Sequence, residues 1–227
     1  MTNKRPVSIF DVIGPIMVGP SSSHTAGAVR LGRMGRAILG RQPERAIIEL
    51  HGSFAQTGQG HGTDKAIIAG LLSMPPADER LPFSFAHAQA AGLQFEFQIA
   101  DLGDDAHPNT VRMTLSAAGE TVRVVGASLG GGQMEINQID DYDVRFTGEY
   151  ETLLIRAEDR PGTVNTVTGW LLEHGVNVAF LRVERQKRGG DAIMIVEIDD
   201  APPSLLIDDL VGISWVRWVR HVRKSED

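Results

Sequence analysis

Three serines and a histidine stand directly before an expected helix in the stretch VGPSSSHTAGAVRLG, residues 18–32. A helix N-terminus attracts anions because its free N–H groups and the positive end of its dipole point outward. Hydroxyls from Ser22 and Ser23, together with an imidazole at His24 that can carry a proton, predict a pocket for a carboxylate or a phosphate. The alternative is simple capping, since either serine can accept a hydrogen bond from the first free amides.

A second histidine stands in similar surroundings in GQGHGTDK, residues 58–65. Glycines flank His61 and allow other groups to approach it, and Thr63 or Asp64 is expected to cap the helix that follows. A single histidine in a loop is usually a surface residue. Two histidines in matching positions, His24 and His61, favour a shared site that binds an anion and transfers protons.

A third candidate is His107 in AHPNT, although Pro108 and Asn109 are also ordinary turn residues. The glycine-rich SLGGGQ, residues 128–133, lacks the lysine and the spacing of a phosphate loop, so we interpret it as a tight turn or a wall that faces a ligand. The spacing of the three histidines matches no compact zinc motif. We therefore expect no metal to be held by the histidines of this chain.

The elements around these motifs indicate an α+β domain over residues 1–146, with helices early and strands late. The first helix, 25–39, contains Gly27, Gly32 and Gly35, each of which costs about 1 kcal/mol relative to alanine. We expect these glycines to serve close packing or the close approach of a ligand. The expected elements are a strand at 45–50, a loop at 51–65, a helix at 63–72, period-two strands from 93, 111 and 121, and a last strand at 134–139.

The residues after a boundary near 144–149 form a second domain, 150–227. Its predicted order of elements is β-α-β-β-α-β, which is typical of a ferredoxin-like sandwich with four antiparallel strands and two helices on one face. The strands are expected at 150–157, 175–185, 192–199 and 213–222, with helices at 163–174 and 203–210 and a hairpin turn at 186–191.

Composition narrows the function classes. The 227 residues carry a net charge of −7, and the basic residues form no long block, which argues against nucleic acid as a partner. No apolar stretch is long enough to span a bilayer, and the N-terminus lacks the apolar core of a signal peptide, so we expect a cytoplasmic protein with no membrane contact. The chain has no cysteine. By itself it can form neither a disulfide nor a thiolate-bound metal site.

Four ordered motifs resemble one family. SIFDVIGPIMVGPSSSHTAGAVRLG, GSFAQTGQGHGTDKAIIAGLL, HPNT and SLGGG are similar to the β chain of iron–sulfur-dependent L-serine dehydratases. In the second domain, EDRPGTVNTV and LLEHGVNVAFLRVER resemble an ACT domain. The pairing of the two domains also resembles the C-terminal half of some 3-phosphoglycerate dehydrogenases, where it is regulatory.

The resemblance implies the conversion of L-serine to aminoacrylate, which hydrolyses to pyruvate and ammonia. In this family a [4Fe–4S] cluster is held by cysteine thiolates and keeps one iron open as a Lewis acid. Those thiolates would belong to a separate α chain, with the active site at the α/β interface. The resemblance assigns the proton transfers to His61 and His107. Substrate binding, or the orientation of the histidines, would fall to Ser22, Ser23, His24, Thr25, Thr63 and Asp64.

For the ACT domain, the resemblance places an amino-acid ligand between paired domains, near Asp159, Gly162 and Asn177. Serine-sensing dehydrogenases carry a histidine and an asparagine in this loop, whereas this chain has Ala157 and Asp159. We therefore favour a homodimer formed through this domain, by its sheet edge or its helices, over serine feedback. The alternative function for the whole chain is a non-catalytic, amino-acid-sensing regulatory subunit, although a sensor has no need for ordered histidine motifs.

Overall fold

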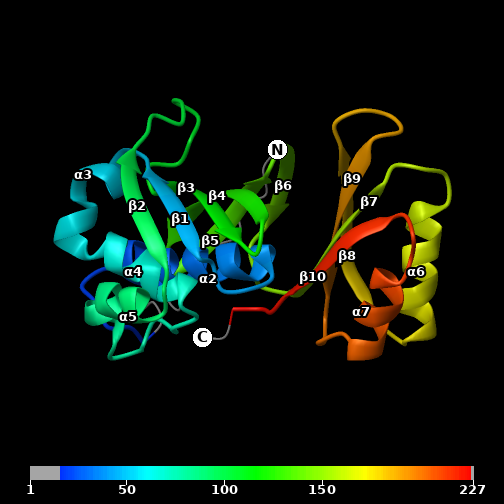
Figure 1. Cartoon of the computed structure of the whole chain (residues 1–227), viewed down its shortest axis with the longest axis horizontal. Helices are drawn as coiled ribbons and strands as arrows, with labels where there is room; N and C mark the ends of the chain where they lie inside the picture. Colours follow the sequence, from blue (N-terminus) through cyan, green and yellow to red (C-terminus); the bar gives the residue numbers. More distant parts are fainter. Residues whose placement is uncertain (1–15, 226–227) are drawn as a thin grey trace.

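The computed structural model describes residues 16–225 and shows two units side by side, each built on one sheet (Figure 1). Residues 1–15 and 226–227 lie outside the described part, and with them the start of the first sequence motif and the segment inspected for a signal peptide. No helix within residues 16–225 is both long enough and apolar enough to cross a membrane.

The first unit is a six-stranded sheet in the order β2-β1-β3-β4-β5-β6. Strands β1 and β2 are parallel because α3, α4 and α5 form the crossover between them, and the other pairs are antiparallel. The elements are η1 (Ser22–Gly27), α2 (Ala28–Leu39), β1 (Arg45–Leu50), α3 (Gly52–His61), α4 (Thr63–Leu71), η2 (Leu81–Phe83), α5 (Ser84–Ala90), β2 (Gln94–Ile99), β3 (Thr110–Ala117), β4 (Glu120–Gly130), β5 (Gln133–Ile139) and β6 (Tyr142–Phe146).

The second unit has the predicted β-α-β-β-α-β order, and its antiparallel sheet runs β10-β7-β9-β8. The expected α+β class and the ferredoxin-like unit are confirmed.

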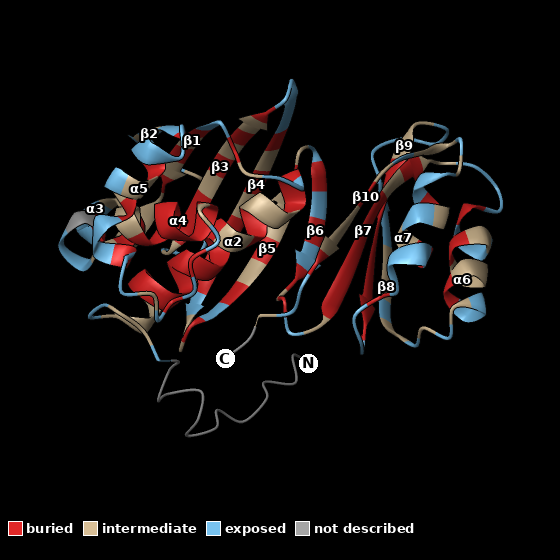
Figure 2. Cartoon of the chain, turned by 60° about the horizontal axis from the view of Figure 1, so that its bottom comes forward, coloured by how far each residue is buried: buried red, intermediate tan, exposed pale blue. Residues whose placement is uncertain are grey.

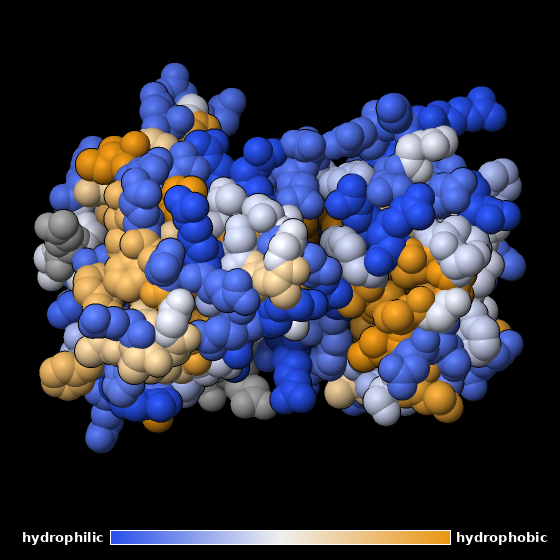
Figure 3. Space-filling view, viewed as in Figure 1, coloured by the Kyte–Doolittle hydropathy of each residue, from blue (hydrophilic) through white to orange (hydrophobic). Residues whose placement is uncertain are grey.

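Hydrophobic residues gather on the surface over α6 and α7 (Figure 3), where Leu172, Leu205 and Val211 are exposed. The elements are β7 (Glu151–Glu158), α6 (Thr163–Glu173), β8 (Val178–Arg185), β9 (Asp191–Ile198), α7 (Ser204–Val211) and β10 (Val216–Val222).

The two central strands of the second sheet, β7 and β9, are buried on both faces. Leu153 and Ile155 pack in the core beneath α6 and α7, whereas Leu154 and Ile195, on the opposite face, join the core of the first unit. Figure 2 shows β7 and β9 buried along almost their whole length. This burial explains why the middle of each strand, residues 153–155 and 192–196, is a continuous apolar run rather than an alternating one, and it fixes the second unit against the first.

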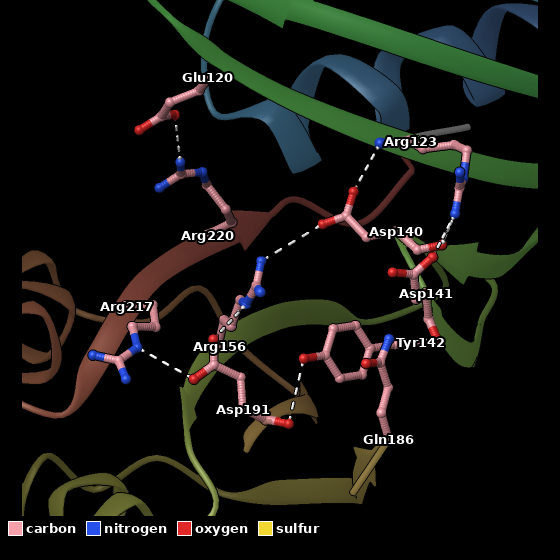
Figure 4. A network of polar contacts seen from close by, with 10 residues as sticks. All are labelled: Glu120, Arg123, Asp140, Asp141, Tyr142, Arg156, Gln186, Asp191, Arg217 and Arg220. Atoms are coloured by element: carbon pink, nitrogen blue, oxygen red, sulfur yellow. Dashed lines mark hydrogen bonds and ion pairs between the residues drawn. The ribbon is translucent and has the colours of Figure 1, made fainter.

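Polar contacts flank this shared core. Arg156 of β7 lies 3.7 Å from Asp140, and the Tyr142 hydroxyl donates to the carbonyl of Asp191 at 3.3 Å. Figure 4 shows these contacts bringing the β5–β6 turn against β7 and β9. Burial raises the pKa of Tyr142, so its hydroxyl stays protonated and remains a donor at neutral pH.

The structure corrects the predicted course of the chain at three places. The expected loop at 51–65 is largely helix α3, the described residues include α5 between the second helix and β2, and β6 adds an edge strand after the expected last strand. Helix α4 is capped neither by Thr63 nor by Asp64, because Gly62 occupies the N-cap position without any side-chain cap bond. Glycines within α3 and alanines within α5 concealed both helices from a search for hydrophobic periodicity.

Glycines bring α2 and α4 into close contact, and for Gly32 this is one of the two uses that the sequence suggested. A Cβ on Gly32 would lie 2.4 Å from the carbonyl oxygen of Ile67, and a Cβ on Gly70 would lie 2.1 Å from that of Val29. Both neighbours are backbone atoms, which cannot move aside as a side chain can. The close contact joins the first half of α2 to the second half of α4 and holds the two helices against each other.

We predict that Gly70→Ala destabilises the protein by about 1–3 kcal/mol, because the added methyl group must force the two backbones apart. The matched control is Gly169→Ala in α6, where, among the described residues, no atom outside the adjacent helix backbone lies within 4 Å of the added carbon. This control should be neutral or stabilising by up to about 1 kcal/mol, since alanine favours a helix interior. Urea unfolding measures both changes, and equal stability of the two variants would contradict the packing argument.

Candidate active site

The helix predicted at 25–39 begins earlier, with the π-helical turn η1, and continues into α2. Its N-cap is Ser21, whose hydroxyl accepts from the amide of His24 at 3.3 Å, so capping falls to neither Ser22 nor Ser23. The side chains of Ser22 and Ser23 are thus not used as caps. The first turn contains no acidic residue, which leaves the positive end of the helix without a built-in counter-charge.

His24 is the centre of the site. Its ring is buried, with 8 % of the residue exposed, and its Nδ1 lies 2.9 Å from the Thr63 hydroxyl of α4. Its Nε2 lies 3.2 Å from the Ser53 hydroxyl of α3. Hydroxyls can both donate and accept, so either neutral tautomer is satisfied. Burial lowers the pKa of His24, and the nearby His61 lowers it further, so the ring is neutral at physiological pH.

His61 ends α3 and lies beside His24, with ring centroids 4.9 Å apart. Its Nδ1 lies 3.1 Å from the carbonyl oxygen of Thr57, one helical turn earlier. A carbonyl can only accept, so Nδ1 carries the hydrogen and Nε2 keeps its lone pair in the neutral ring. His61 is exposed, unlike His24. The arrangement therefore presents one accessible imidazole nitrogen that can take up a proton.

The other two motifs pack against this cluster. The Ser128 hydroxyl of SLGGG donates to the carbonyl of Ser23 at 2.9 Å, and its amide donates to the carbonyl of Asn109 at 3.0 Å. Pro108 lies against Gly52 at the start of α3, where an added Cβ would lie 2.7 Å from the Pro108 carbonyl oxygen. The four motifs that are far apart in the sequence are therefore one connected cluster.

The glycines of SLGGG form the β4–β5 turn, as one of the two sequence interpretations predicted. Gly130, Gly131 and Gly132 all have positive φ angles, of 103°, 60° and 84°, which other residues adopt only with strain. The carbonyl of Gly132 accepts a hydrogen bond from Arg30 of α2 at 2.7 Å. The turn is thereby held against the first helix.

His107 is placed differently from the other two histidines. It is exposed, and its Nδ1 accepts a hydrogen bond from the Asn109 amide at 3.1 Å, so the neutral ring carries its hydrogen on Nε2. The ring borders a groove of about 600 Å³ that is also lined by Arg112 and Asn137, on the sheet face opposite α2. The structure thus brings His24 and His61 together, whereas His107 lies on the neighbouring loop with its ring at a separate groove.

The remaining predicted residues lie around the cluster in different roles. Thr63 is fully buried and holds His24, and Asp64 accepts from the amide of Lys65 at 2.8 Å. The Thr25 hydroxyl is buried and has no hydrogen-bond partner within residues 16–225. An unpaired buried hydroxyl costs about 1–3 kcal/mol, and this one packs beneath Gly19, where an added Cβ would lie 2.4 Å from its oxygen.

Sequence reasoning missed Ser53, Thr57 and Ser128. The first two stand at helical spacing with His61, four residues apart each time, and so occupy one face of α3. That spacing is the signal that identifies them, but it can be used only once residues 52–61 are recognised as a helix. Ser128 was assigned to the end of a strand and the start of the glycine turn, and nothing in the sequence indicated that it would reach Ser23.

Comparison with known proteins decides the family. The model for the serine dehydratase beta chain matches residues 8–138, and the model for the ACT domain matches residues 152–213. The chain belongs to the serine dehydratase beta chain family. Both matches agree with the two units of the fold, and the first includes all four motifs of the site.

Relatives of similar length carry the same family name. The "Probable L-serine dehydratase, beta chain" of Bacillus subtilis is 41% identical over 89% of this chain and 92% of its own length. The "L-serine dehydratase, beta chain" of Peptoniphilus asaccharolyticus is 38% identical over 95% and 97%. A "D-3-phosphoglycerate dehydrogenase" of Synechocystis is 25% identical over 84% of this chain but only 34% of its own length. That match agrees with the predicted resemblance of the domain pair to part of such dehydrogenases.

We predict that His24 makes the stability of the protein depend on pH. The pKa of His24 is lower in the folded state than the value of 6.5 that it has in the unfolded chain. The contribution of the neutral ring to the free energy of unfolding is therefore fully present above pH 6.5. Stability is then lost as pH falls through the folded pKa, because the buried ring must be protonated. Urea unfolding at pH 8 and pH 5 should show a smaller loss for His24→Asn than for the wild type. Equal losses in the two proteins would contradict a neutral, buried His24.

Proposed function

We propose that this chain is the cytoplasmic β subunit of an L-serine dehydratase, which converts L-serine to pyruvate and ammonia together with an α chain. The observation that carries the proposal is the 4.9 Å approach of His24 and His61, from two separate motifs, at the start of the η1–α2 helix. This arrangement offers an anion-binding helix end beside an imidazole with an accessible lone pair. The names of its relatives support serine as the substrate.

The carboxylate of serine would bind at the start of η1. Free amides there attract an anion, and the hydroxyls of Ser22 and Ser23 can donate to its oxygens, whereas the buried Thr25 supports the turn from beneath. A neutral His24 adds no charge to this pocket, and its hydrogen bonds to Thr63 and Ser53 fix the wall of the pocket next to His61. Asp64 lies in the first turn of α4 and would interact with the substrate ammonium.

Elimination from serine needs a base for the α-proton and an acid for the departing hydroxyl. His61 fits the base, because the Thr57 carbonyl holds the hydrogen on Nδ1 and leaves Nε2 free to accept. His107 fits a donor, because the Asn109 amide occupies Nδ1 and leaves the hydrogen on Nε2. The two rings are thus held in opposite tautomers. Aminoacrylate, the product of the elimination, hydrolyses to pyruvate and ammonia.

The residues of this chain do not fit a [4Fe–4S] cluster. Such clusters are held by cysteine thiolates, and the chain has none, while the site offers hydroxyls and imidazoles. We propose that the α chain holds the cluster and that the two chains close the active site between them. When bound, an open iron of the cluster would supply a Lewis acid for the departing hydroxyl. The accessible Nε2 of His61 and the exposed His107 are then the groups that this chain offers across the interface.

We predict that the purified chain alone binds no cluster and is inactive. Anaerobic treatment with iron and sulfide should give no stable cluster absorbance, because no thiolate is present to hold one. Assembly with a cysteine-containing α chain should produce both the absorbance and serine-dependent pyruvate formation. A stable cluster on this chain without the partner would overturn the shared-site proposal, and the α chain alone is the control for activity.

We predict that His61→Ala and His107→Ala, each assembled with the α chain, lower kcat by roughly 10²-fold or more, as is typical for the loss of a general acid or base. The matched control is His87→Ala in α5, outside the four motifs. If the three variants keep equal activity, the chain is not catalytic. That result would favour the alternative of a regulatory subunit that senses amino acids.

The second unit supports a homodimer better than an amino-acid site. The Asp159 carboxylate accepts from Arg185 at 2.9 Å and from the Gly189 amide at 3.0 Å, and Asn177 donates to Asp199 at 2.7 Å. The side chains predicted to bind a ligand are thus engaged within the chain, and Gly162 offers only backbone amides at the start of α6. Strand β8 is an edge of its sheet, available for pairing with a second copy.

We predict that the full chain sediments as a dimer and that Val183→Lys, at an exposed position on β8, shifts it toward monomer, because charged residues block edge pairing. Titration calorimetry of the full chain with L-serine should show no heat of binding that depends on Asn177. Saturable binding that Asn177→Ala abolishes, while His61→Ala retains it, would contradict this and restore the ligand site.

A further inference from the structure

A cavity of about 480 Å³ lies between α2 of the first unit and β10 of the second. Arg33, Arg36 and Arg41 line it from α2 and the residues after it, and Arg220, Arg223 and Lys224 line it from β10 and its extension. No Asp or Glu is among the described residues of its lining. In a chain with a net charge of −7, this is a local concentration of positive charge that the proposed reaction does not use.

Two of these cations are held in place by the protein. Arg36 donates to the carbonyl of Leu71 at 3.0 Å and also to the side chain of Gln42. Arg220 donates to Glu120 at 3.3 Å, the contact that Figure 4 shows between β10 and the start of β4. Anchored guanidinium groups lose little conformational freedom when they bind a ligand.

The same two cations are partly removed from water. Burial lowers the pKa of Arg36, and no carboxylate opposes that effect. Burial also lowers the pKa of Arg220, where attraction to Glu120 is partly offset by repulsion from Arg41. Glu120 lies 3.3 Å from Arg220 and 3.8 Å from Arg41 and compensates that pair, whereas Arg36 has no carboxylate partner among the described residues. A desolvated charge without a counter-charge is destabilising unless an anion binds beside it.

We propose that this cavity binds a small, phosphate-bearing anion that bridges the two units. The planar fork of arginine matches two phosphate oxygens at once, and the volume lies within the range of small-molecule pockets. Because the lining comes from α2 and from β10, one ligand would contact both units. The α2 wall of the cavity continues into η1, so the bound anion would contact the helix that carries His24 at its other end.

Titration calorimetry of the full chain with inorganic pyrophosphate, at constant ionic strength, tests the proposal. Orthophosphate and malonate are titrated in parallel, to separate recognition of phosphate from recognition of any dianion. The variants are Arg33→Gln on α2 and Arg223→Gln after β10, one from each side of the cavity. The matched control is Arg188→Gln, at an exposed position in the β8–β9 turn. Thermal unfolding checks that each variant is folded.

We expect saturable binding of pyrophosphate that each of the two cavity variants weakens by about tenfold or more, the loss typical of one charge-assisted hydrogen bond. Arg188→Gln should bind as the wild type does. The proposal is overturned if pyrophosphate gives no saturable heat, or if all three variants lose affinity equally. If malonate binds as tightly as pyrophosphate, the cavity has no preference for phosphate over other dianions, and the proposed ligand class is wrong.

Discussion

The buried imidazole of His24 is held between the hydroxyls of Thr63 and Ser53, and this arrangement joins η1, α3 and α4 at one point. The ring can be buried there because its neutral form satisfies both hydroxyls, and burial in turn keeps it neutral. The close backbone contact of Gly32 and Gly70 with the opposite helix holds α2 and α4 together, and the bond between His24 and Thr63 joins η1 to the start of α4. His61, one of the two proposed proton carriers, is placed against this fixed ring.

The sequence predicted the two histidines that the fold brings together, because each stood in a polar segment next to a helix start. It could not show how they are connected. Gly58 and Gly60 lower helix propensity within α3, so Ser53 and Thr57 were assigned to a loop although their spacing from His61 is helical. The sequence predicted strands at the positions of β7 and β9, but a strand covered on one face by helices and on the other by another unit cannot be recognised without the tertiary structure.

The placement of His107 explains why a second chain is part of the proposal. Its ring borders a groove on the sheet face opposite α2, whereas the His24–His61 pair lies at the helix starts. The connection between the two is the contact of Pro108 with Gly52 and the bonds of Ser128 to Asn109 and Ser23. In the proposed enzyme, the α chain would cover this end of the sheet and bring its cluster to the exposed edges of the four motifs.

Hydrogen–deuterium exchange of this chain, alone and assembled with a cysteine-containing α chain, tests the shared site most directly. The account predicts that assembly slows exchange in residues 22–27, 57–63, 107–110 and 128–132, which form the connected cluster. The β8–β9 turn, residues 186–190, lies in the second unit and should exchange at the same rate in both states. Protection confined to the second unit, with the four motifs unchanged, would contradict the proposal that the partner completes the site around His24.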